Sequence, residues 1–168
     1  MQFEKSERTA ELEHALLAAI AVPLSQNKKV LWLVPGGSNI SVAVRVMNQI
    51  DAEQSEHLTV MLTDERFGAP GHANSNYTQL FDAGFQPKWA QFDDLLIGAS
   101  LDATIQTAEE SYKKACSTAE HIIGFFGLGS DGHIAGILPH SPAASRGENW
   151  VVGYEASPFI RMTLTPFA

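Results

Sequence analysis

The sequence predicts an α/β fold with a mostly parallel sheet and helices on both faces of that sheet. Three largely apolar runs, at residues 30–34, 58–62 and 122–126, have the length and composition of buried strands. Between these runs lie segments whose apolar residues recur at helical spacing. Strands that alternate with helices are typical of a parallel sheet, because a crossover helix returns the chain to the start of the next strand.

The other elements follow from the same two patterns. Helical spacing predicts helices over residues 6–24, 39–50, 76–81 and 102–117. Shorter apolar runs predict further strands over residues 94–97, 150–154 and 160–164. The segment 64–66 (Asp-Glu-Arg) carries three charges, and we expect it to be a loop after the second strand.

The length and composition indicate a single domain over residues 1–168. A chain of 168 residues with 45% apolar content is long enough to bury one ordinary core. No internal repeat or long linker divides it. The single Cys116 excludes an internal disulfide framework and indicates a reducing compartment, so we expect a cytoplasmic protein.

The charge and the apolar runs exclude several kinds of partner. The net charge is −8, with only 11 Lys and Arg residues, which disfavours binding to duplex nucleic acid or to an anionic lipid surface. The apolar run from Ala15 to Leu24 contains Pro23 and is too short to cross a bilayer. The mixed charges before it do not resemble the start of a signal peptide. A small anion remains a suitable ligand, because a local group of backbone amides can bind one on an acidic protein.

Three polar segments follow the three apolar strands and should meet at one edge of the sheet. They are Gly36-Gly37-Ser38, Asp64-Glu65-Arg66 and Asp131-Gly132-His133. Ligands bind at the carboxyl edge of an open parallel sheet. The sequence therefore predicts a binding site built from these three segments.

Each segment suits a different part of the chemistry. In the first segment, the two glycines let backbone amides approach a phosphate at the start of the following helix. The alternative interpretation is a glycine turn between strand and helix that binds no ligand. In the second segment, Arg66 can bind a phosphate or carboxylate of the substrate. Asp64 or Glu65 can orient Arg66 or move a proton. The alternative interpretation of these charges is an ion pair on the surface. His133 can serve as a general base whose tautomer is fixed by Asp131.

Other motifs do not support a function. Residues 127–132 fit the dinucleotide pattern G-x-G-x-x-G, but Pro139 and Pro142 follow too closely for the long helix that this motif requires. The chain has no G-x-S-x-G motif of a serine hydrolase. It also has no H-E-x-x-H motif and no cysteine cluster, so no metal site is predicted.

Taken together, the polar segments resemble the 6-phosphogluconolactonases, within the group that includes the glucosamine-6-phosphate isomerases/deaminases. The matching stretches are VPGGSN (34–39), TDERFGAPGHANSNY (63–77), GLGSDGHIAGILPHSP (127–142) and RMTLT (161–165). The resemblance implies a Rossmann-like sheet, no metal or organic cofactor, and a sugar phosphate as substrate. The implied reaction is hydrolysis of 6-phosphoglucono-δ-lactone to 6-phosphogluconate in the oxidative pentose phosphate pathway.

The resemblance also implies roles for individual residues. His133 matches the histidine that activates water, and Asp131 matches the acid beside it. Arg66 and the Gly36-Gly37-Ser38 segment match contacts to the substrate and its phosphate. Arg161 falls on the position of a family arginine near the site.

The chain departs from the family pattern in two places. Asn39 and Ile40 stand where the family commonly has Thr and Pro. The sequence ends at Ala168, where members of the family usually continue with a strand, a helix and a phosphate-binding lysine. We therefore expect a C-terminally shortened fold with an open sheet edge, and both a monomer and a homodimer are compatible with that.

Two alternative functions stay open at this point. One is a glucosamine-6-phosphate isomerase/deaminase, but Leu138 replaces the glutamate of those proteins, and Arg66 stands where they tend to have tyrosine. The other is a sugar-phosphate binder or remnant without catalysis. The presence of both Asp131 and His133 favours a lactonase over such a binder.

Overall fold

The computed structural model describes residues 9–145 and 147–168, and its centre is a sheet of four parallel strands. The strands lie in the order β4-β2-β1-β5. They are β1 (Val30–Val34), β2 (Leu58–Leu62), β4 (Gln91–Phe92) and β5 (His121–Gly124). In β1 and β2 nearly every side chain is buried, as expected for strands covered on both faces.

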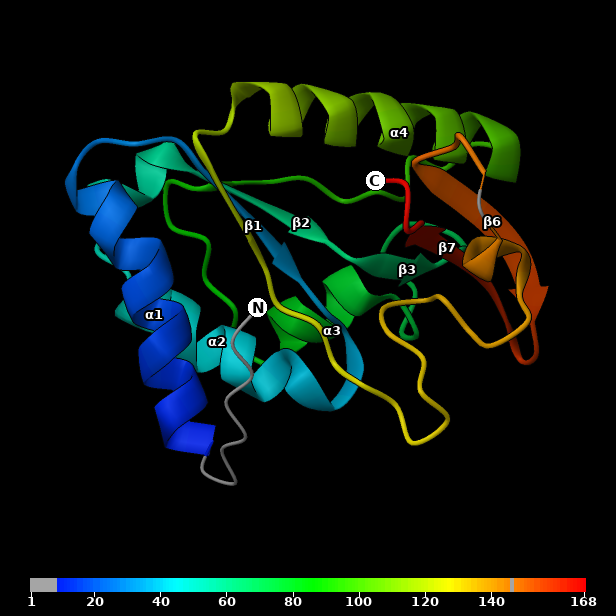
Figure 1. Cartoon of the computed structure of the whole chain (residues 1–168), viewed down its shortest axis with the longest axis horizontal. Helices are drawn as coiled ribbons and strands as arrows, with labels where there is room; N and C mark the ends of the chain where they lie inside the picture. The colour runs from blue at the N-terminus through cyan, green and yellow to red at the C-terminus, as the bar shows by residue number, and fades with distance from the viewer. Residues whose placement is uncertain (1–8, 146) are drawn as a thin grey trace.

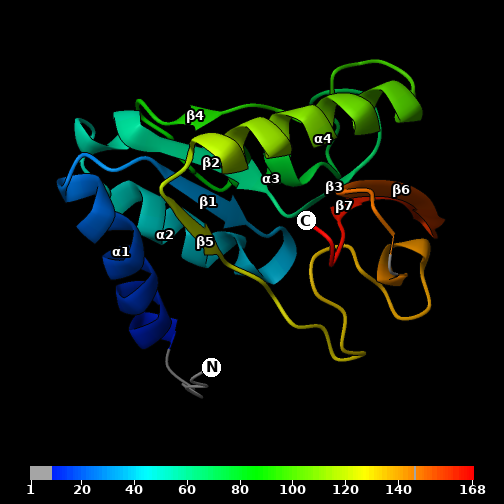
Figure 2. The ribbon, with the colours of Figure 1, turned by 45° about the horizontal axis from the view of Figure 1, so that its top comes forward.

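Helices cover both faces of this sheet, which confirms the predicted α/β class. They are α1 (Thr9–Ser25), α2 (Ile40–Gln49), α3 (Asn76–Asp82) and α4 (Leu101–Thr118). Figure 1 shows α4 above the sheet with α1 and α2 below it, and Figure 2 shows the strands in the order β4-β2-β1-β5 from top to bottom. The predicted beginning of the first helix at Ser6 lies outside the described residues. None of the helices in the described ranges has the length and hydropathy needed to cross a membrane.

The core lies between these layers. Trp32 of β1 is fully buried against Phe85.

Capping side chains mark where two of the helices begin. The hydroxyl of Ser75 accepts a hydrogen bond from the Thr78 amide and caps α3. Ser100 caps α4 in the same way.

A second, antiparallel sheet stands at one end of the molecule (Figure 1). Its strand order is β3-β7-β6, with β3 (Asp64–Arg66), β6 (Val151–Ala156) and β7 (Phe159–Leu164). Thr63 joins the two sheets: its amide donates to the Val34 carbonyl of β1, and its carbonyl accepts from the Leu164 amide of β7. The carboxyl ends of β1 and β2 are therefore held against β7.

Three expectations from the sequence need correction. Residues 64–66 form strand β3 rather than a loop, because their backbone pairs with β7. Residues 94–97 are not a strand; the strand next to β2 is Gln91–Phe92, and Leu95 and Leu96 bury their side chains from an irregular backbone. The strands over residues 151–156 and 159–164 do form, but they pair antiparallel in the second sheet.

Candidate active site

A pocket opens where the carboxyl ends of β1 and β5 meet the second sheet. Its volume is about 250 Å³. Seven of the nine residues predicted for the site line it, from all three polar segments and β7. The lining residues are Pro35, Gly36, Gly37, Ser38, Asp64, Arg66, Asn76, Gly127, Leu128, Gly129, His133, Ala135 and Arg161. The expected convergence of the segments at one edge of the sheet therefore occurs.

The glycine segment after β1 needs its glycines for two different reasons. Gly37 has φ +65°, a left-handed conformation that favours glycine. Gly36 lies so close to the Asn76 side chain that an added Cβ would be 2.0 Å from the Asn76 Oδ1 atom. Beyond the segment, Asn39 packs its amide against Gly127 and so joins the first polar segment to the third. Since α2 begins at Ile40, its positive N-terminal end follows directly.

Two arginines stand side by side in the pocket wall. Arg66 of β3 and Arg161 of β7 are cross-strand neighbours. The Arg66 guanidinium donates to the Asn74 carbonyl at 2.8 Å and lies over the Phe159 ring, while Arg161 lies 3.6 Å from the Asp64 carboxylate. The Nε atoms of both arginines are buried and have no hydrogen-bond partner within the described residues. Adjacent like charges repel, so this wall favours a bound anion.

Asp64 supplies a negative charge beside these arginines. Its side chain is buried, and its carboxylate accepts a hydrogen bond from the Thr63 hydroxyl at 3.2 Å. Burial raises the pKa of Asp64, while Arg66, Arg161, the Thr63 hydroxyl and His133 act in the opposite direction. The carboxylate is thus positioned to hold Arg161 in the pocket.

Glu65 does not line the pocket, in contrast to its predicted role as a substrate contact. Its side chain is fully buried on the opposite side of β3. The carboxylate accepts hydrogen bonds from the amides of Arg66, Asn76 and Tyr77 and from the Ser75 hydroxyl, at 2.6–3.0 Å. Burial raises the pKa of Glu65, and these donors oppose the rise. Glu65 therefore holds the beginning of α3 against β3.

His133 and Asp131 form a hydrogen-bonded pair at the mouth of the pocket. The His133 Nδ1 atom lies 2.5 Å from the Asp131 Oδ1 atom, and this bond lowers the pKa of Asp131. An ionised carboxylate only accepts, so Nδ1 donates and Nε2 keeps a free lone pair. The ring packs over Gly129, where a Cβ would lie 2.3 Å from it. Asp131 itself lies outside the pocket lining and contacts the site through His133.

Asn76 is the main site residue that the sequence analysis did not identify. It is buried at the beginning of α3, and its Nδ2 donates to the Asp64 carbonyl at 2.8 Å. Its side chain also meets Gly36, so it holds the glycine segment against β3. Asn76 lies within a stretch that resembles the family, but only the fold shows which segments it joins.

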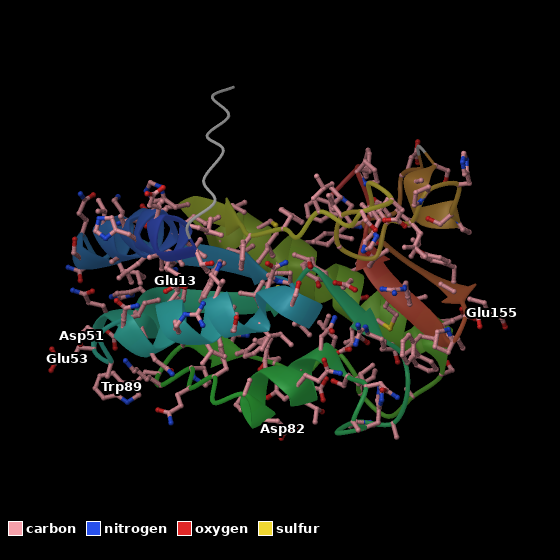
Figure 3. The ribbon with its side chains drawn as sticks, turned by 90° about the horizontal axis from the view of Figure 1, so that it is seen from below. Glu13, Asp51, Glu53, Asp82, Trp89 and Glu155 are labelled. Atoms are coloured by element: carbon pink, nitrogen blue, oxygen red, sulfur yellow. The ribbon has the colours of Figure 1, made fainter. Side chains whose placement is uncertain are left out.

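The acidic charge of the chain lies largely away from this pocket. Figure 3 shows Asp51 and Glu53, from one turn after α2, together with Asp82 and Glu155 on the outside of the molecule, where all four are exposed. In the pocket wall, two arginines face one carboxylate. Among the described residues, no group of three or more His, Cys, Asp or Glu side chains is arranged to hold a metal ion.

The fold and the pocket define an α/β protein in which two arginines lie in a pocket beside a histidine–aspartate pair. A family model described as glucosamine-6-phosphate isomerases/6-phosphogluconolactonase matches residues 4–168. The chain therefore belongs to that family, as its motifs suggested. No curated protein matches the chain.

Solved structures show the same fold. A 6-phosphogluconolactonase from Shewanella baltica superposes with a TM-score of 0.74 at 23% identity, over 95% of this chain and 72% of that one. The enzyme from Thermotoga maritima gives 0.71 at 19% identity, over 96% and 75%. The enzyme from Trypanosoma brucei gives 0.69 at 21% identity, over 95% and 72%. All three chains are longer than this one.

Proposed function

We propose that this protein hydrolyses 6-phosphoglucono-δ-lactone to 6-phosphogluconate, with His133 as general base. One observation supports this most directly: the arginine pair and the histidine–aspartate pair open onto the same pocket. Family membership and the names of the solved relatives agree with it. The reaction belongs to the oxidative pentose phosphate pathway, and we place it in the cytoplasm.

In the proposed mechanism, the phosphate binds Arg66, Arg161 and the glycine segment. Binding energy from the phosphate then fixes the lactone ring, whose carbonyl reacts elsewhere. The Nε2 atom of His133 takes a proton from water as the oxygen attacks that carbonyl. The ring C–O bond breaks, the leaving oxygen takes the proton back from the His133 imidazolium, and the carboxylic acid so formed loses its proton to the solvent. General-base help of this kind contributes roughly 10²–10⁴-fold in rate.

In this mechanism Asp131 and Asp64 are positioning groups. Asp131 holds the imidazole in the tautomer that leaves Nε2 free. Asp64 holds Arg161 beside Arg66. We no longer assign Glu65 to the substrate, since it caps α3.

The sequence argument against an isomerase or deaminase agrees with the structure of the loop. Leu138, at the position of the glutamate of those enzymes, uses its backbone amide to bind the Tyr154 hydroxyl. Its side chain has no group that could move a proton. The lactonase is therefore the function that the site supports best.

The proposal is tested by giving the purified chain two substrates. We expect it to accelerate hydrolysis of fresh 6-phosphoglucono-δ-lactone above the spontaneous rate, and to release no ammonia from glucosamine 6-phosphate. Ammonia release would instead establish the deaminase. Binding of 6-phosphogluconate without acceleration would establish a sugar-phosphate binder.

A further inference from the structure

We propose that Tyr154 is a positioning residue for His133, acting through the backbone of Gly136. The inference rests on the proposed function, because it concerns the general base of that reaction. Tyr154 lies in β6, outside the pocket lining, and is not part of any motif that resembles the family. Its effect on the site is therefore indirect.

The segment that carries His133 is held most closely at Gly136. Among residues 126–142, all of which the structure describes, Gly136 alone is buried. Its amide donates to the Thr163 hydroxyl at 3.0 Å, and its carbonyl accepts from the Tyr154 hydroxyl. The same hydroxyl accepts from the Leu138 amide at 3.4 Å. Strands β6 and β7 thus hold Gly136 by both of its backbone polar groups.

Close packing strengthens this attachment. A Cβ added at Gly136 would lie 2.8 Å from the Thr163 Cβ and 3.2 Å from the Asp64 Cβ. Apolar contacts of the segment are few by comparison, since Leu128 is 77% and Ile134 is 40% exposed. The hydrogen bonds at Gly136 therefore restrain the part of the segment that directly follows His133.

The backbone on either side of His133 needs such a restraint. Gly132 has φ +87° and Ala135 has φ +50°. The left-handed conformation is ordinary for glycine but unfavourable for alanine, so surrounding contacts must hold it at Ala135. Gly136 is the next residue. A loss of the Tyr154 bonds would let Ala135 relax and would move the His133 imidazole relative to the bound lactone.

Small movements of a general base have large effects on rate. A displacement of about 1 Å can lower a rate by up to roughly 10²-fold. Substrate affinity depends on Arg66, Arg161 and the glycine segment in the proposed mechanism. Tyr154 is the cross-strand partner of Arg161, but its hydroxyl binds Gly136 and Leu138 instead of these groups, and a change to phenylalanine removes the hydroxyl alone. We therefore expect Tyr154 to affect kcat rather than KM.

The first test compares Tyr154→Phe with the wild-type chain. The ring stays and only the hydroxyl is lost, so we expect kcat to fall about tenfold while KM stays within about twofold. Tyr112→Phe is the matched control, because Tyr112 is also buried and its hydroxyl binds the Leu62 carbonyl away from this segment. It should lower the melting temperature without lowering kcat. Equal losses of kcat in both variants would overturn the proposal.

The second test asks whether Tyr154 acts through His133. In a His133→Ala background, Tyr154→Phe should cause no further loss of rate, since the group that it positions is already absent. A full additional loss would show a general structural defect and would contradict the proposal.

A third readout does not need activity. In the substrate-free protein, the ¹⁵N signals of the His133 imidazole should report one tautomer, with Nδ1 protonated, and Tyr154→Phe should mix the two. Unchanged signals would overturn the proposal. If the wild-type chain does not hydrolyse the lactone, the proposed function fails, while these signals still decide whether Tyr154 positions His133.

Discussion

The two arginines of the pocket wall are the basis of the proposed phosphate site. Arg66 and Arg161 lie side by side with Asp64 as their close counter-charge. Each has a buried Nε donor without a partner among the described residues. A phosphate group supplies both the charge and the acceptors that this wall lacks.

Removing one of these charges should weaken substrate binding. Hydrogen bonds to charged groups contribute about 1.5–3 kcal/mol, so Arg66→Met should raise KM by roughly ten- to a hundredfold and change kcat less. Steady-state kinetics on the lactone measure both constants. Arg45→Met is the control, because Arg45 binds Glu13 on the surface. An unchanged KM in Arg66→Met would remove Arg66 from the substrate site.

We expect His133 to determine how the activity depends on pH below neutral. The hydrogen bond from His133 lowers the pKa of Asp131, so that carboxylate stays ionised when the pH falls below neutral. A protonated imidazole cannot accept a proton from water. We expect kcat/KM to fall as the pH drops from neutral into the acid range. A flat profile there would contradict the role of His133 as a base.

The element scale explains why neighbouring residues of one motif have different roles. Residues 64–66 form a strand, and side chains of a strand alternate between its two faces. Asp64 and Arg66 therefore face the pocket, while Glu65 faces α3. Three consecutive charges show no apolar alternation, so the sequence predicted a loop here. The strand exists because its backbone pairs with β7, almost a hundred residues later in the chain.

The hydrogen bonds that Glu65 accepts at the beginning of α3 should contribute to the stability of the fold. Glu65→Gln replaces one accepting oxygen by an NH₂ group, which would face a backbone amide that must donate. We expect the free energy of unfolding at neutral pH to fall by about 1–3 kcal/mol, as for other buried groups left without a partner. Urea denaturation measures this change. Glu56→Gln, at an exposed position, should have little effect; an equal loss in both variants would contradict the capping role.

In two other places the apolar pattern of the sequence did not predict how the strands pair. The short apolar run suggested a strand over residues 94–97, and its Leu95 and Leu96 are indeed buried. Apolar content reports burial but not backbone pairing, and the pairing with β2 occurs earlier, at Gln91–Phe92. Similarly, the sequence predicted β6 and β7 as strands but could not show that they form a separate antiparallel sheet, since that depends on β3.

For the whole molecule, the parallel sheet is what allowed the site to be predicted. Parallel strands β1, β2 and β5 place their carboxyl ends together, and this brought the three polar segments to one place. The rule gives no information on what closes the pocket from the other side. That part comes from the second sheet and from Asn76, whose contacts join segments far apart in the chain.

A ligand that binds the folded chain should stabilise the whole molecule. At a concentration of a hundred times Kd, such a ligand adds about 2.7 kcal/mol to the free energy of unfolding. We expect 6-phosphogluconate to raise the melting temperature and gluconate, which has no phosphate, to do so much less. Differential scanning fluorimetry makes the comparison. Equal shifts for both compounds would contradict a phosphate site at the arginine pair.

The central claim is that this pocket hydrolyses a phosphorylated lactone with His133 as base, and a rate measurement tests it most directly. Hydrolysis of fresh 6-phosphoglucono-δ-lactone is followed against its spontaneous rate for the wild-type chain, for His133→Ala, and for His14→Ala as an exposed control on α1. We predict acceleration by the wild type and by His14→Ala, and a loss of about 10²-fold or more in His133→Ala. A folded wild-type chain without acceleration, or a His133→Ala variant with full activity, would contradict the account.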